Sequence, residues 1–133
     1  MVRYFSDNAT RPNRARQAFE ILIGCAMRKQ LISYGELKGL MYPETEGGGA
    51  QSIAPTIGCI LFWCQANNLP LLNTIVINES SPDVWQRGLP GSGCGIDPEE
   101  VPAMWARVFE FDWYSIEPPT EEELAETACG LAA

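Results

Sequence analysis

The chain contains no histidine among its 133 residues, and this absence narrows the chemistry open to it. Ser-His-Asp and Cys-His catalysis both need an imidazole as the general base, and many zinc sites need one as a ligand. There is also no CxxC pair, and three of the five cysteines, Cys25, Cys59 and Cys64, lie in apolar helical patterns. We therefore expect no disulfide framework, no metal and no cofactor.

Long hydrophobic segments are missing as well. The longest apolar run surrounds residues 57–63 and is too short to span a bilayer. The first ten residues, MVRYFSDNAT, lack the apolar core of a signal peptide. We therefore expect no membrane association and a reducing cytoplasm as the location. Hydrophobic residues make up 46% and charged residues 20%, values that predict one globular domain.

Basic residues are scarce beyond Lys38. The net charge is −8, yet residues 1–40 carry +4, whereas residues 41–133 carry −12. Because phosphate backbones attract Lys and Arg, nucleic-acid contact is expected only near the N-terminus. The candidate nucleic-acid-binding residues are Arg11, Arg14, Arg16, Arg28, Lys29, Tyr34 and Lys38. An acidic protein can instead bind a basic protein surface, so this second interpretation stays open.

Hydrophobic periodicity predicts a first helix over residues 14–29, capped by Asn13, with Arg14, Arg16 and Arg28 facing outward. Residues 31–32 can form a very short strand. Ser33 and Glu36 have the spacing of a capping box, which predicts a short helix ending near Met41.

Further along the chain, a third helix is predicted over residues 52–67, with a left-handed cap at Asn67-Asn68. Residues 71–78 are rich in branched aliphatic side chains and predict a buried strand. Asp97-Pro98 indicates the start of another helix, which Pro102 can delay. Residues 111–116 (FDWYSI) favour either a last strand or an aromatic strap over the core.

The predicted organisation is a flexible arm over residues 1–12, a core over residues 13–116 and an acidic tail helix over residues 117–133. Thr120 and Glu123 form a second capping box at the start of this tail, which we expect to be peripheral. Trp63 lies one residue off the main apolar stripe of its predicted helix, and Trp85 lies in a polar loop, so both are candidates for exposed interface anchors; together with two glutamates at a helix start they make up the candidate protein-interface residues. These are Trp63, Trp85, Glu99 and Glu100.

Residues 31–95 resemble the C-terminal domain of the DNA alkyltransferase and alkyltransferase-like family. The matching segments are 31–37 (LISYGEL), 57–61 (IGCIL), 71–77 (LLNTIVI) and the glycine-rich 88–95 (GLPGSGCG). The resemblance implies a winged-helix-like α+β fold, mostly helical, with a short β-sheet or hairpin and a wing at residues 88–95. It also requires the strand after Asn68 to lie beside the strand at residues 31–32.

The chain differs from that family at the positions of the family's reactive and DNA-contacting residues. The alkyl-accepting cysteine and its histidine would fall near residues 72–74, which here are Leu, Asn and Thr. The arginine that enters the duplex would fall near Pro55, and proline cannot replace a charged plane. We therefore expect a protein that is not an enzyme, although Tyr34 and the scaffold carry over.

Two functions remain open from the sequence. The first is a non-catalytic winged-helix-like binding module for nucleic acid or a partner protein. The second is an acidic inhibitor or adaptor of the anti-defence type, which would occupy a basic surface of a nucleic-acid enzyme. The layout is also similar to small bacterial domains related to phage–host conflict, which implies a setting of that kind.

Overall fold

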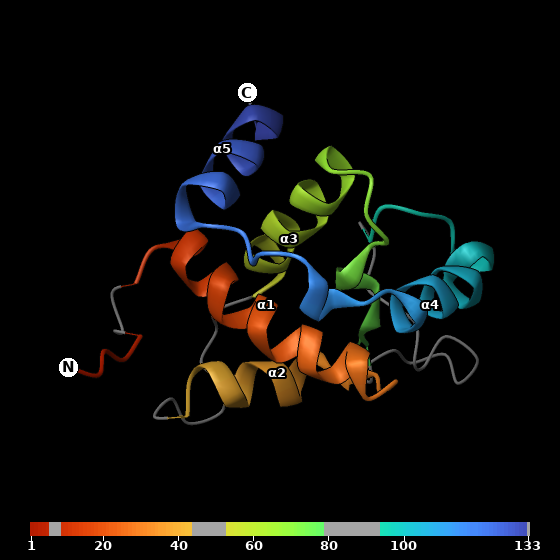
Figure 1. Cartoon of the computed structure of the whole chain (residues 1–133), viewed down its shortest axis with the longest axis horizontal. Coiled ribbons are helices and arrows are strands. Elements are labelled where there is room, and N and C mark those ends of the chain that lie inside the picture. The colour runs from red at the N-terminus through yellow and green to blue at the C-terminus, as the bar shows by residue number, and fades with distance from the viewer. Residues whose placement is uncertain (6–8, 44–52, 79–93, 133) are drawn as a thin grey trace.

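The computed structural model describes residues 1–5, 9–43, 53–78 and 94–132, with side chains up to residue 126. The elements in chain order are α1 (Arg11–Met27), β1 (Ile32–Ser33), α2 (Tyr34–Met41), α3 (Ala54–Ala66), η2 (Leu72–Ile75), β2 (Val76–Ile77), η4 (Pro98–Glu100), α4 (Val101–Glu110), η5 (Trp113–Ser115) and α5 (Glu121–Ala132), where η denotes a 3-10 helix. Figure 1 shows α1 at the centre of the helices. The predicted fold class, a small and mostly helical α+β domain, is confirmed.

The two short strands pair in parallel, with Ile32 opposite Val76 and Ser33 opposite Ile77. The strand after Asn68 thus lies beside the first strand, as the resemblance requires. The predicted strand over residues 71–78 is wrong in its first half, which forms η2. The backbone N–H and the hydroxyl of Thr74 both donate to the Leu71 carbonyl, at 3.0 and 2.7 Å, and close this tight turn.

The predicted wing lies mostly outside the described residues, which resume at Cys94. Where they resume, the chain packs closely on α3. Gly95 has a φ of +99°, and a Cβ there would come within 2.7 Å of Leu61 Cδ1. The positive φ therefore favours glycine at this position, and a Cβ would also require the end of the Leu61 side chain to move.

The first helix begins earlier than predicted. Thr10 caps it, since its hydroxyl accepts a hydrogen bond from the Asn13 N–H at 3.3 Å, so Asn13 is not the cap. Pro12 lies in the first turn, where a backbone N–H has no partner within the helix, so the N–H that proline lacks is not missed. At α2 the predicted capping box is confirmed by both reciprocal bonds of Ser33 and Glu36. After α3, Asn68 adopts the predicted left-handed conformation, with a φ of +55°.

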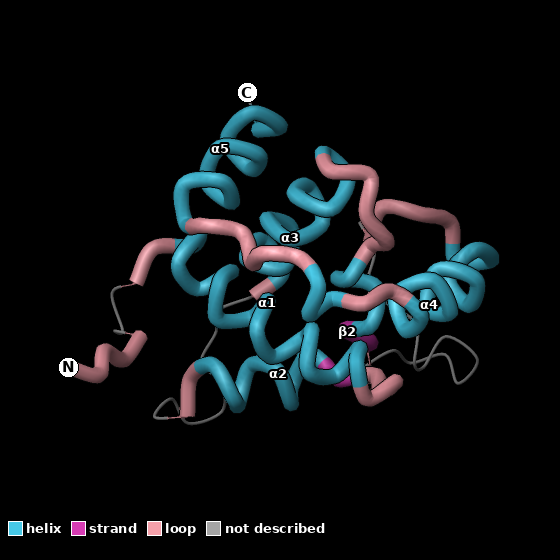
Figure 2. Tube along the Cα trace, viewed as in Figure 1, coloured by secondary structure: helices cyan, strands magenta, loops and turns pink. Residues whose placement is uncertain are grey.

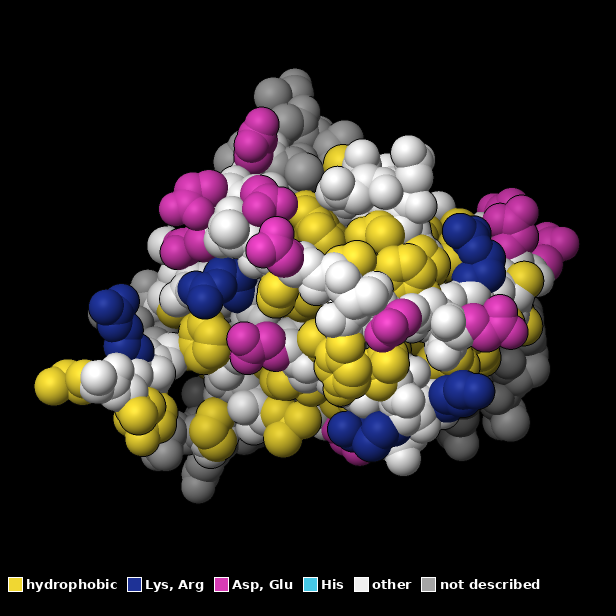
Figure 3. All heavy atoms as spheres, in the orientation of Figure 1, with side chains coloured by type: hydrophobic (Ala, Val, Ile, Leu, Met, Phe, Trp, Pro, Cys, Tyr) yellow, Lys and Arg dark blue, Asp and Glu magenta, His cyan; other side chains and the backbone are white. Residues whose placement is uncertain are grey.

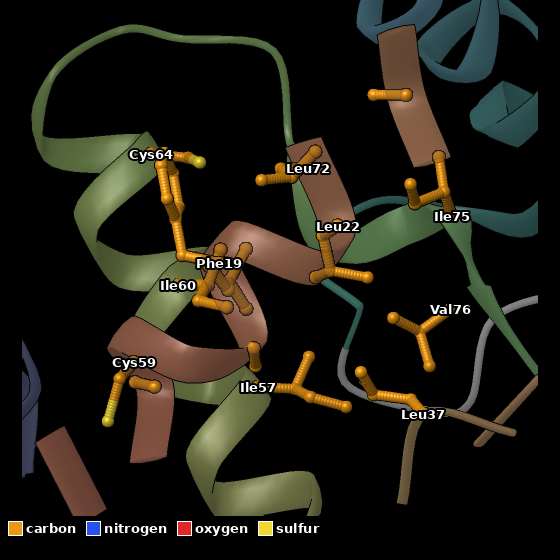
Figure 4. Close-up of a cluster of buried hydrophobic side chains, with 14 of the residues drawn as sticks. Phe19, Leu22, Leu37, Ile57, Cys59, Ile60, Cys64, Leu72, Ile75 and Val76 are labelled. Atoms are coloured by element: carbon orange, nitrogen blue, oxygen red, sulfur yellow. The ribbon is translucent and has the colours of Figure 1, made fainter. Parts of the chain in front are cut away.

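Figure 4 shows core side chains from α1, α2, α3, η2 and β2, and the same core also includes residues of β1, α4, η5 and α5. Phe19 and Leu22 come from α1, Leu37 from α2, Ile60 from α3, and Ile75 from η2, and all five are buried. The Phe19 ring lies edge-on to Trp63 and to Trp113, with centroid separations of 5.5 and 6.4 Å. This packing places α1 between α3 and the chain that leads to α5.

The tail helix is confirmed as a helix, but its predicted peripheral position is wrong. Leu124 of α5 is completely buried in the same core, and α5 packs against both α1 and α3 (Figure 1). The chain between α4 and α5 crosses α1 and consists of the short 3-10 helix η5 with a loop on each side (Figure 2). Residues 111–116 therefore form the aromatic strap rather than a strand, and the indole of Trp113 donates to the Val108 carbonyl at 2.8 Å.

Candidate binding surfaces

The third helix offers no charge to a ligand. None of the thirteen residues of α3 is Lys, Arg, Asp or Glu. Ala54 and Pro55 are exposed at its start, and Gln65 and Ala66 are exposed at its end. The resemblance places contact with DNA near Pro55, so this helix would meet a phosphate backbone without a cation.

Arg14 does not face outward, and its prediction as a nucleic-acid contact is wrong. Its side chain is only 4% exposed. One guanidinium nitrogen donates to the Met41 carbonyl at 2.9 Å and to Gln17 Oε1 at 2.8 Å, and the guanidinium carbon lies 4.2 Å from the centroid of the Tyr42 ring. Arg14 therefore fastens the C-terminal end of α2 to α1. The long stem and forked head of arginine make such burial feasible when the donors are used.

The other predicted basic residues lie in separate places. Arg11 and Arg16 are exposed near the beginning of α1, and Arg28 and Lys29 are exposed just after its end. Along the helix axis, Arg28 lies about 18 Å from Arg16 and about 25 Å from Arg11. On α2, Lys38 and Tyr34 are half-buried, and Tyr34 packs against the core. The structure thus divides these residues between the two ends of α1 and the helix α2.

The predicted interface residues also have different outcomes. Trp63 is only 6% exposed, and its indole N–H donates to Glu123 Oε2 at 3.4 Å, so its prediction as an exposed anchor is wrong. Trp63 instead joins α3 to α5. Trp85 lies outside the described residues, whereas Glu99 and Glu100 are exposed on η4 as predicted.

A hollow of about 410 Å³ lies between α1 and the beginning of α5. Its lining includes Arg16, Phe19 and Glu20 from α1 and Pro119, Glu121 and Glu122 from the chain entering α5. Figure 3 shows carboxylates gathered over the start of α5, with a second group at the beginning of α4. No pattern in the sequence indicates this hollow, because about a hundred residues separate its two sides and the tail helix was expected at the periphery.

A second hollow, of about 470 Å³, is lined by residues 94–97 and Glu100. Beside it, the buried Asn73 donates from Nδ2 to the Cys94 carbonyl at 3.0 Å, and its Oδ1 has no hydrogen-bond partner among the residues that the structure describes. Asn73 occupies the region in which the resemblance places the reactive cysteine. An amide is neither a nucleophile nor a base, so it cannot replace a thiolate there.

The thiols of the described residues are poorly suited to catalysis. Cys25, Cys59 and Cys64 are buried and free. Burial raises the pKa of Cys64 to about 12 and also raises the pKa of Cys25, so both thiols keep their protons at neutral pH. Cys94 is half-buried, and its Sγ lies 3.3 Å from the Ile96 carbonyl oxygen.

Comparisons of the chain with family models, curated proteins and solved structures gave no match. Within the described part of the chain, no helix has the length and apolar character needed to cross a membrane.

Proposed function

We propose that this chain is a non-catalytic, winged-helix-like binding module whose partner is a protein with a basic surface. The observation that carries the proposal is the charge-free third helix. Ala54 and Pro55, exposed where the alkyltransferase-like domains meet DNA, provide no cation and no side-chain hydrogen-bond donor. Small apolar groups of this kind suit contact with another protein better than contact with phosphates.

The winged-helix-like kinship is part of the proposal, and the parallel pairing of β1 with β2 supports it. The absence of turnover is supported by the residues at the expected reactive position. Leu72, Asn73 and Thr74 are all buried there. With no histidine in the chain, none of the buried thiols has an imidazole that could activate it.

The sign of the partner's charge follows from the distribution of exposed groups. The chain has a net charge of −8, and exposed glutamates occupy both the start of α5 and η4. The basic residues of α1 are split between its two ends, and Arg14 is engaged inside the protein. A partner with Lys and Arg on its surface is therefore attracted at long range. Nucleic-acid enzymes form one class of proteins with such surfaces.

The test compares nucleic acid with protein as the ligand. Single- and double-stranded DNA and RNA are first offered to the full chain in a mobility-shift assay at low salt. The matched variant is Arg28→Glu/Lys29→Glu, which reverses the two exposed cations after α1. We expect no shift for either protein. A wild-type shift that disappears in the variant and weakens with salt would overturn the proposal.

The positive arm uses the wild-type chain as bait in a nuclease-treated extract of its host. The expected result is one protein that, once purified, forms an equimolar complex in calorimetry. Its association rate should fall as salt rises, because opposite charges steer the encounter. A protein that is captured only when the nuclease is omitted would argue against the proposal.

A further inference from the structure

We propose that the hollow between α1 and the start of α5 is a docking site for an arginine side chain of the partner protein. This inference rests on the proposed function and adds the place and the chemistry of one contact. The hollow combines an apolar floor with a rim of carboxylates, and both features match a guanidinium group.

The floor is made by Phe19 and two consecutive prolines, Pro118 and Pro119. Pro118 is exposed and supplies accessible apolar surface of the floor, whereas Phe19 and Pro119 are buried and are held firmly by the packing around them. A guanidinium group is planar and weakly hydrated, and it can lie against apolar or aromatic surfaces while its N–H groups reach acceptors at the side. The volume of about 410 Å³ accommodates the end of one long side chain.

The rim carries three carboxylates, from Glu20, Glu121 and Glu122. The Thr10 hydroxyl donates to Glu121 Oε1 at 2.6 Å and thereby orients that carboxylate. Among the described residues, the carboxylates of Glu20 and Glu122 take part in no hydrogen bond or ion pair. Two acceptors are therefore available to a cation that enters the hollow.

The helix dipole explains only part of this arrangement. Glu121 and Glu122 lie in the first turn of α5, where acidic residues stabilise a helix start. Glu20 lies in the middle of α1, where the dipole gives no such benefit, and it still faces the same hollow. Arg16 is the one cation of the lining, and its Nη1 donates to Asn13 Oδ1 at 2.8 Å. One guanidinium thus stands against three carboxylates, which leaves the hollow negative.

Arginine fits this geometry better than lysine. Its fork of N–H groups can bind two carboxylates at once in one plane, whereas an ammonium group is strongly hydrated and acts as a point charge. The apolar floor adds to this preference because it desolvates a guanidinium at a lower cost than an ammonium.

The experiment is an NMR titration of the ¹⁵N-labelled full chain with N-acetyl-arginine amide. The control probe is N-acetyl-citrulline amide, which has nearly the same shape but no charge. The test variant is Glu20→Gln/Glu122→Gln, and the matched control is Glu99→Gln/Glu100→Gln, which removes the same charge on η4. Both pairs are exposed, so all the proteins are expected to fold.

We expect the arginine probe to shift the amides of residues 16–20 and 120–122, and citrulline to leave them unchanged. The variant at Glu20 and Glu122 should weaken binding about three- to tenfold, as expected for the loss of two exposed ion pairs. The variant at Glu99 and Glu100 should bind like the wild type. Equal weakening by both variants, or equal shifts by citrulline, would overturn the proposal.

This result is independent of the nucleic-acid assay. If the chain binds DNA or RNA through Arg28 and Lys29, the proposed function fails, while the titration still reports whether the hollow takes a guanidinium. If the partner protein binds normally to the variant at Glu20 and Glu122, the proposed function stands. The docking site is then wrong.

Discussion

The helices α2 and α5 begin with the same sequence signature, but they differ in how much of their apolar surface the rest of the protein covers. At α2, Ser33 and Glu36 exchange the two capping bonds, at 3.1 and 3.2 Å, and the helix leaves Leu40 59% exposed. At α5, Thr120 accepts from the Glu123 N–H at 3.1 Å, and Leu124 is completely buried. A capping box therefore marks where a helix starts, whereas long-range contacts decide how much of the helix is covered.

The glutamates of the two boxes show how this difference arises. Glu36 is exposed on α2 and bonds within its own box. Glu123 accepts from the Thr120 hydroxyl at 3.3 Å and also from the indole of Trp63 on α3 at 3.4 Å. The second contact links the start of α5 to a helix that is sixty residues distant in the chain. The start of α5 is thus tied to α3 and carries exposed carboxylates, whereas α2 leaves the large apolar side chain of Leu40 exposed to solvent.

The largest expected effect tests whether α5 belongs to the core. Leu124→Ala removes a completely buried side chain, as Leu37→Ala does on α2, and each should lower the free energy of unfolding by about 2–5 kcal/mol. Urea denaturation measures both variants, and Leu124→Met serves as a milder change that keeps most of the volume. A cost below about 0.5 kcal/mol for Leu124→Ala would return α5 to the periphery.

The next effect concerns alkaline pH. Burial raises the pKa of Cys64 from 9.0 to about 12, so the folded chain keeps a proton that the unfolded chain loses above pH 9. The stability that this thiol contributes is complete below pH 9 and falls as the pH rises toward 12, at a rate of up to about 1.4 kcal/mol per pH unit. Urea midpoints from pH 8 to pH 10 measure the loss.

The buried thiols of Cys64 and Cys25 lie in different electrostatic surroundings, so their effects on alkaline stability can be compared. Cys64 lies on α3, which α5 covers, whereas Cys25 lies near the charges of Arg28 and Glu36. Burial also raises the pKa of Cys25, but the positive charge of Arg28 opposes the shift. Cys64→Ala should therefore flatten the alkaline loss more than Cys25→Ala. Identical slopes in the wild type and in Cys64→Ala would contradict the assignment.

Substitutions in the two capping boxes should have smaller effects, and the boxes should differ in their coupling to Trp63. Ser33→Ala and Thr120→Ala should each cost about 1 kcal/mol, since each removes the acceptor of a helix-start N–H. Combined with Trp63→Phe, Thr120→Ala should be non-additive, because both residues bond to Glu123. The same combination with Ser33→Ala should be additive. Additivity in both double variants would show that Glu123 does not couple α5 to α3.

The sequence predicted the elements better than it predicted their exposure. The capping box at Ser33 and the left-handed Asn68 follow from local signals and are confirmed. The pairing of the two strands, which the structure also contains, was implied by the family resemblance. Arg14 and Trp63 were placed on the surface because of their residue types and helical positions. Both are buried because their polar groups find partners from α2 and α5, and no local pattern carries that information.

The candidate site illustrates the same limit. Glu20 and the glutamates of α5 each read as solvated charges when their own segments are considered. They come to face one hollow because Leu124 and the strap through Trp113 bring α5 against α1. The charge imbalance of the C-terminal part was visible in the sequence, but the apolar floor beside it depends on the tertiary packing.

The smallest expected effect concerns Leu40, the exposed apolar side chain of α2. Leu40→Ala removes a large apolar side chain that is 59% exposed, and it should change the free energy of unfolding by less than about 0.5 kcal/mol. Leu37→Ala, one helical turn earlier and completely buried, provides the matched contrast. The measurement is repeated at several protein concentrations. A cost for Leu40→Ala that approaches that of Leu37→Ala and grows with concentration would mean that a second copy covers α2, and the contrast with α5 would then be lost.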